Sequence, residues 1–187
     1  MLNHQGTKIL TTARLTLRPF TADDAPAMFR NWASDPEVTK YLTWPTHESV
    51  EISEMVLTDW CSHYTELDFY QWAIVPKDID EPIGTISVVG SDEKTKKIHI
   101  GYCIGSKWWN FGYTSEAFAA IISFFFEQVE AKRIESQHDP KNVGSGKVME
   151  KCRLIYEGTL RNADWNNRGI VDARMYAILA SDYLKNR

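Results

Sequence analysis

SKWWNFGYTSEAF, from Ser106 to Phe118, places a single glycine inside a run of large aromatic residues and then continues into an apolar segment. The residues before it alternate like a strand, and those after it have helical spacing. A strand, a tight turn at Gly112 and a helix N-terminus expose free backbone N–H groups and a dipole that favours anions. Thr114 and Ser115 add hydroxyl groups that can cap the helix or donate to a ligand. The stretch predicts an anion site; the alternative is that Gly112 only makes a turn and that the aromatic residues are core.

Outward from this stretch, the chain alternates between strand-like and helix-like segments. Tyr70–Pro76, Pro82–Gly90 and Lys97–Gly105 are strand candidates whose polar connectors are typical of an antiparallel meander. A strongly apolar helix is expected over Ser115–Glu130. The other expected elements are a strand at Arg14–Phe20, a helix capped by Thr21, a loop at Asp35–Pro45, a helix at Glu48–Tyr64, a strand at Arg133–Asp139, a short helix at 142–152, and closing strands at 154–162 and 171–183. This order predicts an α+β fold with a mixed, mostly antiparallel central sheet and helices on both faces.

Composition excludes several classes of protein. The 187 residues are 43% hydrophobic and no linker or repeat divides them, so we expect a single domain over residues 1–187. A net charge of −4 disfavours a dedicated nucleic-acid binder, and no apolar run has the length of a membrane span. The N-terminus has no secretory signal, and the few, widely spaced cysteines and scattered histidines predict neither a disulfide framework nor a metal site. We therefore expect a soluble, cytoplasmic protein.

Two ordered runs carry a family resemblance. IGYCIGSKWWNFGYTSEAF, followed by DPKNVGSGKVMEKCRLIYEGTLR, resembles the GNAT superfamily of N-acetyltransferases, and more closely its RimJ and RimL branch of ribosomal-protein acetyltransferases. That branch reads roughly I-G-Y-W-I, W-G-x-G-Y-A-T-E-A, D-P-x-N-x-x-S and K-x-G-F-x-x-E-G-x-x-R. RLTLRPFTADDA, DPEVTKYLTWP and VDARMYAIL are similar to its first strand and the start of its first helix, its next loop and its last strand. The resemblance covers nearly the whole chain and implies a sheet whose strands splay at an acetyl-CoA slot.

The chain departs from the branch pattern at two elements. Asn110 replaces the glycine after the tryptophan, and Phe111 replaces a basic or polar residue. The K-x-G-F element reads KCRL over 151–154, so its Gly and Phe are both absent. Gly144 and Gly146 weaken the start of the expected short helix by about 0.5–1 kcal/mol each. These departures bear on turnover more than on the fold.

The resemblance implies acetyl-CoA as co-substrate and no metal. The amides expected to hold its pyrophosphate are those of Asn110, Phe111, Gly112, Tyr113, Thr114 and Ser115. Cys103 and Ile104 lie on the strand along which the pantetheine arm would run, and an N–H near Ile104 would stabilise the oxyanion. Because the family transfers acetyl directly, Cys103 is interpreted as a small strand residue and not as a nucleophile. Asn142 falls on the family's asparagine that bonds the arm, with a helix N-cap as the alternative.

The chemistry implied is attack of a neutral amine on a thioester, which needs a deprotonated amine and a protonated or solvated leaving thiolate. Ser145 falls on the family's serine near the sulfur and is the candidate proton donor; a structural role is the alternative. His99 titrates in the useful range and is a candidate base, although a strand histidine is also a packing or solvent-facing residue. Glu54, Glu66 or a chain of waters would serve as well.

The acceptor is expected over the first two helices and the following loop. The candidate wall residues are Trp32, Tyr41, Trp44 and Tyr70, and ordinary core or loop anchoring is the alternative for each. Such a groove suits a peptide N-terminus or a small amine, and the loop aromatics are compatible with a homodimer. The expected function is an acetyl-CoA-dependent N-acetyltransferase acting on a primary amine. The altered K-x-G-F element keeps open a non-catalytic module that binds acyl-CoA as a sensor.

Overall fold

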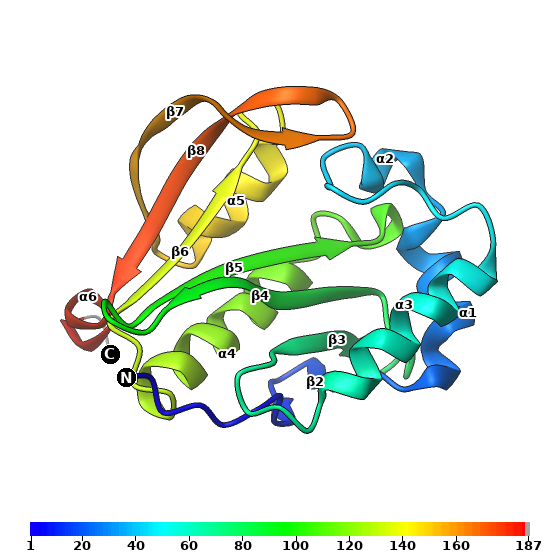
Figure 1. Ribbon diagram of the computed structural model, residues 1–187, viewed down its shortest axis with the longest axis horizontal. Helices are drawn as coiled ribbons and strands as arrows, with labels where there is room; N and C mark the ends of the chain where they lie inside the picture. Colours follow the sequence, from blue (N-terminus) through cyan, green and yellow to red (C-terminus); the bar gives the residue numbers. More distant parts are fainter. Residues whose placement is uncertain (186–187) are drawn as a thin grey trace.

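One eight-stranded sheet runs through the computed structural model, which describes residues 1–185 (Figure 1). The strands are β1 (Leu10–Thr11), β2 (Leu15–Arg18), β3 (Gln71–Pro76), β4 (Gly84–Asp92), β5 (Lys97–Ile104), β6 (Arg133–His138), β7 (Ile155–Asn166) and β8 (Gly169–Leu179). Their order is β1-β2-β3-β4-β5-β6-β8-β7, and β5–β6 is the parallel pair among otherwise antiparallel neighbours. The predicted α+β class with a mixed, mostly antiparallel sheet is confirmed.

Helices cover both faces of this sheet, as predicted. They are α1 (Ala25–Met28), α2 (Pro36–Thr39), α3 (Val50–His63), α4 (Tyr113–Glu127), α5 (Val143–Lys151) and α6 (Ala180–Lys185), with 3₁₀ turns at Ala22–Asp24 and Ser106–Trp108 and a π-helical turn at Phe29–Ala33. Figure 1 shows α4 and α5 behind the sheet and α1 and α3 toward its other side. Each side has its own apolar cluster, with Phe118 and Phe125 of α4 in one and Met28 and Leu57 of α1 and α3 in the other. None of the helices between residues 1 and 185 is long and apolar enough to cross a membrane.

The helix expected after the aromatic run begins two residues earlier than predicted. Gly112 is its N-cap at φ +81°, a left-handed conformation that glycine adopts without a steric penalty, and α4 starts directly after it. Phe118, Ile121 and Phe125 then point to the same side at helical spacing and are fully buried. The turn therefore decides where the helix starts, and burial of its apolar face holds it on the sheet.

β5 and β6 separate part-way along their length. In the described part of the chain their ladder runs only from Lys97–Arg133 to His99–Glu135, although β5 continues to Ile104 and β6 to His138. Beyond the ladder, the Ser136 hydroxyl donates to the Ile100 carbonyl at 2.8 Å. The strand splay expected from the resemblance is present.

Three expected elements differ in the structure. The expected loop at Asp35–Pro45 contains α2, whose N-cap Asp35 accepts from the Glu37 N–H at 2.9 Å. The last strand was expected to reach residue 183 but ends at Leu179, where α6 begins, and β7 extends to Asn166 instead of residue 162. Hydrogen bonding between the two long strands extends β7, and the apolar pattern alone could not show this pairing.

The backbone is left-handed at both positions where the branch pattern has a glycine that this chain lacks. Asn110 has φ +68°, a conformation that asparagine tolerates better than most residues. Arg153 has φ +64° just after the end of α5, where its N–H donates to the Glu150 carbonyl and the Leu154 N–H donates to the Met149 carbonyl. A helix that ends with these two hydrogen bonds is most stable when glycine occupies the position that Arg153 holds here.

Arg153→Gly is therefore expected to stabilise the fold by about 0.5–1 kcal/mol, because glycine adopts this positive φ without the steric strain that arginine has there. The free energy of unfolding, measured in urea, checks this. Arg153→Ala is the matched control, because it removes the same side chain and its contacts but keeps the strained φ. Equal stabilities of the two variants would show that the backbone conformation is not the cause.

Candidate functional site

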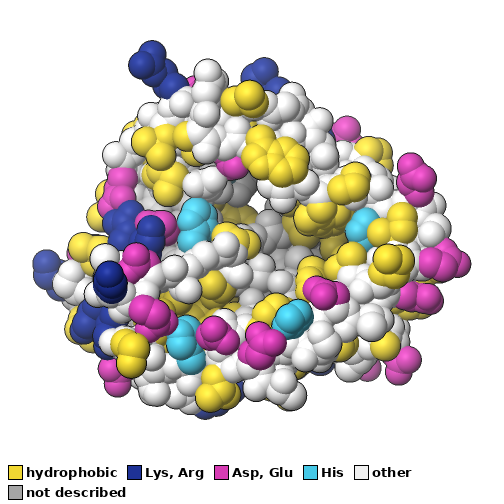
Figure 2. Space-filling view, viewed as in Figure 1, with side chains coloured by type: hydrophobic (Ala, Val, Ile, Leu, Met, Phe, Trp, Pro, Cys, Tyr) yellow, Lys and Arg dark blue, Asp and Glu magenta, His cyan; other side chains and the backbone are white. Residues whose placement is uncertain are grey.

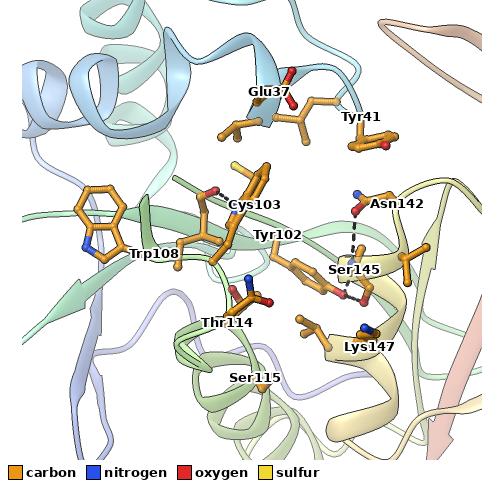
Figure 3. Close-up of a pocket in the computed structure, with 18 of the residues that line it drawn as sticks. Glu37, Tyr41, Tyr102, Cys103, Trp108, Thr114, Ser115, Asn142, Ser145 and Lys147 are labelled. Atoms are coloured by element: carbon orange, nitrogen blue, oxygen red, sulfur yellow. Dashed lines mark hydrogen bonds between the residues drawn. The ribbon is translucent and has the colours of Figure 1, made fainter. Parts of the chain in front are cut away.

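A cavity of about 410 Å³ lies where β5 and β6 separate (Figure 3). Its walls come from α2 and the loop after it, the end of β5 with the following turn, the start of α4, and the β6–α5 loop with α5. The sequence-predicted residues that line it are Tyr41, Cys103, Ile104, Asn110, Gly112, Thr114, Ser115, Asn142 and Ser145. Segments from four parts of the chain thus bring most of the predicted site together.

The head of α4 forms one end of this cavity. The first intrahelical bond runs from the Glu116 N–H to the Gly112 carbonyl at 3.0 Å, so the preceding N–H groups have no partner in the helix itself. Arg14 ties the turn from outside, since its guanidinium donates to Glu116 at 2.7 Å and to the Phe111 carbonyl at 3.0 Å. A Cβ on Gly112 would meet only this guanidinium, at 3.5 Å. The positive φ of Gly112 is therefore a reason for glycine at this position that does not depend on a ligand.

Four lysines line the same cavity and were not singled out from the sequence, and one of them, Lys40, follows α2 and pairs with Glu37. Lys147 and Lys151 stand four residues apart on α5, and Lys141 lies in the loop before it. Their cationic groups add to the positive end of α4 in a chain whose net charge is negative. The spacing of the two lysines on the expected helix was the available signal.

The end of β5 forms one wall of the cavity, and β4 packs closely against this strand. Gly84 of β4 stands opposite Ile104, and a Cβ there would lie 2.4 Å from the Cys103 carbonyl oxygen. The Trp109 indole N–H donates to the Ile104 carbonyl at 3.0 Å. Burial raises the pKa of the Cys103 thiol to about 12, so the thiol stays protonated and is a poor nucleophile.

Ser145 and Tyr102 form a closed hydrogen-bonded pair beside this wall. The Ser145 hydroxyl donates to the Tyr102 phenol oxygen at 3.1 Å, and the phenol donates to the Ser145 carbonyl at 2.8 Å. Asn142 caps α5, its side-chain oxygen accepting from the Ser145 N–H at 3.3 Å, and Figure 3 shows the three side chains converging on one spot. Burial raises the pKa of Tyr102, so the phenol keeps its proton. Sequence reasoning missed Tyr102, although it stands in the quoted IGYCI motif.

His99 lies outside the cavity lining, on β5 where the strands are still paired. Its Nδ1 is 3.5 Å from the Glu135 carboxylate, and both residues point to the face opposite α4. Burial lowers the pKa of His99 below its ordinary value, while attraction to Glu135 opposes that shift. Glu54 and Glu66 are exposed and do not line the cavity either.

Comparison with known proteins gives the family. A family model described as an acetyltransferase (GNAT) domain matches residues 14–155. The chain belongs to the GNAT acetyltransferase family. It is 31% identical over 174 residues to the uncharacterized N-acetyltransferase p20 of Bacillus licheniformis, covering 93% of this chain and 97% of that protein. The chain is thus an acetyltransferase by family.

Its GNAT relatives include proteins of the RimJ and RimL type, as the motifs predicted. The ribosomal-protein-serine acetyltransferase of Escherichia coli is 30% identical over 98 residues, covering 52% of this chain and 55% of that protein. The solved structure of RimL, the ribosomal L7/L12 α-N-protein acetyltransferase, in complex with coenzyme A superposes with a TM-score of 0.82 at 19% identity, covering 94% of this chain and 99% of that chain. At this identity the likeness shows the shared GNAT fold.

Three of the four predicted acceptor-wall residues lie away from the GNAT cavity. Trp32 is fully buried against Phe20 between α1, α3 and β3, because the helices turn their apolar faces to the sheet. Tyr70 stacks on Trp72 and meets α4 on the opposite sheet face, as strand alternation dictates. Trp44 packs on the His47 ring at 5.1 Å, which leaves Tyr41 as the wall residue. Of the four candidates, Trp32 and Tyr70 are buried in the core, and Trp44 packs against it.

Two further predicted residues, Phe111 and Tyr113, direct their side chains away from the cavity. Their rings stack at 6.1 Å, and Arg14 lies over the Tyr113 ring at 4.6 Å. Any part they have in holding a ligand is through their backbone amides, as the sequence suggested.

The helix-weakening glycine Gly146 has a packing reason. A Cβ at this position would lie 2.7 Å from Nε2 of the buried His138, so only glycine lets α5 sit this close to β6. A Cβ on Gly144 would meet nothing closer than the Asn142 side-chain oxygen, at 3.9 Å, so packing does not require glycine there.

Proposed function

We propose that this enzyme transfers an acetyl group from acetyl-CoA directly to a primary amine. One observation carries the proposal: the anion-favouring head of α4 and the unpaired edge of β5 open into the same cavity. A phosphate-bearing thioester needs both features, an anion cradle for its phosphates and an extended edge for its pantetheine arm. A 410 Å³ cavity is within the usual range for sites of small ligands.

Residues of this chain fit each part of acetyl-CoA. The amides from Asn110 to Ser115 would hold the pyrophosphate, with Lys147 and Lys151 neutralising its charge. The backbone of Cys103 and Ile104 would bind the pantetheine arm, and an N–H near Ile104 would stabilise the oxyanion. Bound acetyl-CoA supplies the activated acyl group. The chain's part is to orient that group and exclude water.

Ser145 would return a proton to the leaving thiolate. Its hydroxyl proton points at Tyr102 in the resting protein, so donation requires rotation about one side-chain bond. Burial holds the phenol of Tyr102 protonated, so it would orient the Ser145 hydroxyl and keep its own proton. The proton that the acylated nitrogen loses would return to Ser145 through the base and solvent. Tyr102 would therefore position the serine hydroxyl, and Asn142 would fix the serine backbone.

His99 would act as general base from outside the cavity lining, through a water molecule, with Glu135 behind it. A base accepts a proton only when neutral, and activity falls as pH drops through its pKa. Burial lowers the pKa of His99 below its ordinary value, so kcat at saturating amine should fall only at acid pH, as His99 takes up a proton. His99→Gln should lower kcat about 100-fold and abolish this acid limb.

The control for His99 is His63→Gln, which alters a half-buried histidine of α3 paired with Glu66. It should leave the pH profile unchanged. An acid limb that survives in His99→Gln would rule His99 out and point to a water chain as the base.

The acceptor we propose is a primary amine at a peptide N-terminus, with a small amine as the other form of the same class. Relatives whose names state ribosomal-protein acetylation support the peptide form. Tyr41 and the residues around it would meet the acceptor, since they line the cavity end away from the α4 head.

The test is titration of acetyl-CoA into the protein, followed by a thiol-release assay over a panel of peptides and small amines. Binding with release to one acceptor supports the proposal and names the substrate. Binding without release to any amine would leave a coenzyme-binding module in place of an enzyme. No binding would overturn the proposal.

A further inference from the structure

A strap, residues 166–168 in the turn between β7 and β8, crosses from one wall of the cavity to the other. Asn167 holds its far end. The Asn167 side-chain amide donates to the Thr39 carbonyl at 2.9 Å and to the Trp44 carbonyl at 2.8 Å. The Asn167 backbone N–H donates to the Leu42 carbonyl at 3.0 Å. One residue thus satisfies three carbonyls at the end of α2 and in the loop after it, across more than 120 positions of sequence.

The near end of the strap is fixed to the opposite wall. Asp139, at the end of β6, is buried and accepts from the Asn166 amide at 3.1 Å and from the Arg168 guanidinium at 3.0 Å. Arg168 also lies over the Tyr41 ring at 5.5 Å, and the Tyr41 hydroxyl donates to the Lys141 carbonyl at 3.1 Å. The strap therefore joins the α2 loop to the segment that follows β6.

The strap spans the cavity end away from the α4 head. Figure 1 shows the tip of the β7–β8 hairpin beside the α2 loop, and Figure 2 shows the same face hollowed beneath that hairpin. In Figure 3, Tyr41 and Glu37 stand at one end of the cavity, and Ser115 and Lys147 stand at the other. Since the phosphates belong at the α4 head, the strapped end faces the acceptor.

We infer that Asn167 is a positioning residue that sets the acceptor opening, holding the α2 loop at a fixed distance from the β6–α5 wall. This inference rests on the proposed transfer to an amine. Without the three bonds, the loop that carries Tyr41 and Leu42 is free to move, and the acceptor loses a preformed wall. The acetyl-CoA end, built from α4 and α5, is unaffected.

Asn167→Asp tests this with an isosteric side chain. The substitution replaces the side-chain NH2 group, which donates to the Thr39 and Trp44 carbonyls, with a carboxylate oxygen that cannot donate. KM for the best amine should rise about tenfold, the equivalent of one or two hydrogen bonds, while kcat and KM for acetyl-CoA stay within about twofold. Asn3→Asp is the matched control, because it removes an amide-to-carbonyl bond to Gln128, of 3.0 Å, far from the cavity.

Hydrogen exchange provides a readout that does not depend on catalysis. In Asn167→Asp, exchange should accelerate both in the hairpin tip and in the loop 39–44, and in neither segment of Asn3→Asp. Equal rises in both KM values, or faster exchange in the hairpin alone, would overturn the inference. If the wild type acetylates no amine, the proposed function fails and the specificity role fails with it, while coupled exchange still reports the strap itself.

Discussion

Ser115→Glu is expected to lower the affinity for acetyl-CoA by about 100-fold. Ser115 lines the cavity in the first turn of α4. A carboxylate there, about 5 Å from a bound phosphate at an effective dielectric constant of about 20, costs about 3 kcal/mol per charge pair. Titration calorimetry at low ionic strength measures the change, and higher salt should reduce it.

The fold should tolerate this substitution. An acidic residue in the first turn of a helix interacts favourably with the helix dipole, so the thermal midpoint should not fall. Ser115→Gln is the matched control, because it adds the same bulk without charge, and it should bind acetyl-CoA far more tightly than Ser115→Glu. Equal losses in the two variants would attribute the effect to size and contradict an anion cradle at this helix end.

Gly84→Ala is expected to destabilise the protein by about 1–3 kcal/mol, because the added methyl group has no room. Its Cβ would lie 2.4 Å from the Cys103 carbonyl oxygen and 2.8 Å from the Ile104 Cα. Both are backbone atoms and cannot rotate aside, so β4 and β5 must move apart. Chemical denaturation measures the loss, and acetyl-CoA affinity should fall with it, because the displaced segment is the proposed pantetheine wall.

Gly90→Ala is the matched control on the same strand. A Cβ there would meet only the His99 Cβ, at 3.8 Å, which is an ordinary contact. Its stability and affinity should stay close to those of the wild type. Similar destabilisation by both substitutions would mean that β4 tolerates no alanine for a general reason, and that the close approach to β5 is not the cause.

Sequence patterns predicted those helices and strands that strand alternation or helical spacing marks within a few residues. The period-two segments became β3, β4 and β5, and the long apolar run became α4, because strand alternation and helical spacing each leave a mark within a few residues. The motif order also led to the family. The start of α4 was placed late, since no local pattern shows that Gly112 takes a positive φ.

The site was predicted where it depends on one short segment and missed where it depends on contacts between distant ones. The turn at Gly112 and the serine at 145 line the cavity as expected. The burial of Trp32 and Tyr70 could not be deduced, because aromatic residues occur both in cores and in binding grooves and their identity alone does not distinguish the two. The pairing of Tyr102 with Ser145 joins positions 43 residues apart and leaves no pattern in either segment.

The sequence by itself determined the types of the longer helices and strands, the helix start that favours an anion, and the GNAT family, because backbone propensity, side-chain period and motif order are properties of the sequence itself. Tertiary structure alone decided which side chains share the cavity. The splay of β5 from β6, the packing of Gly146 on His138 and the hold of Asn167 on the α2 loop arise from contacts between segments remote in sequence. Such contacts depend on the geometry of the whole sheet, which no short stretch of residues encodes.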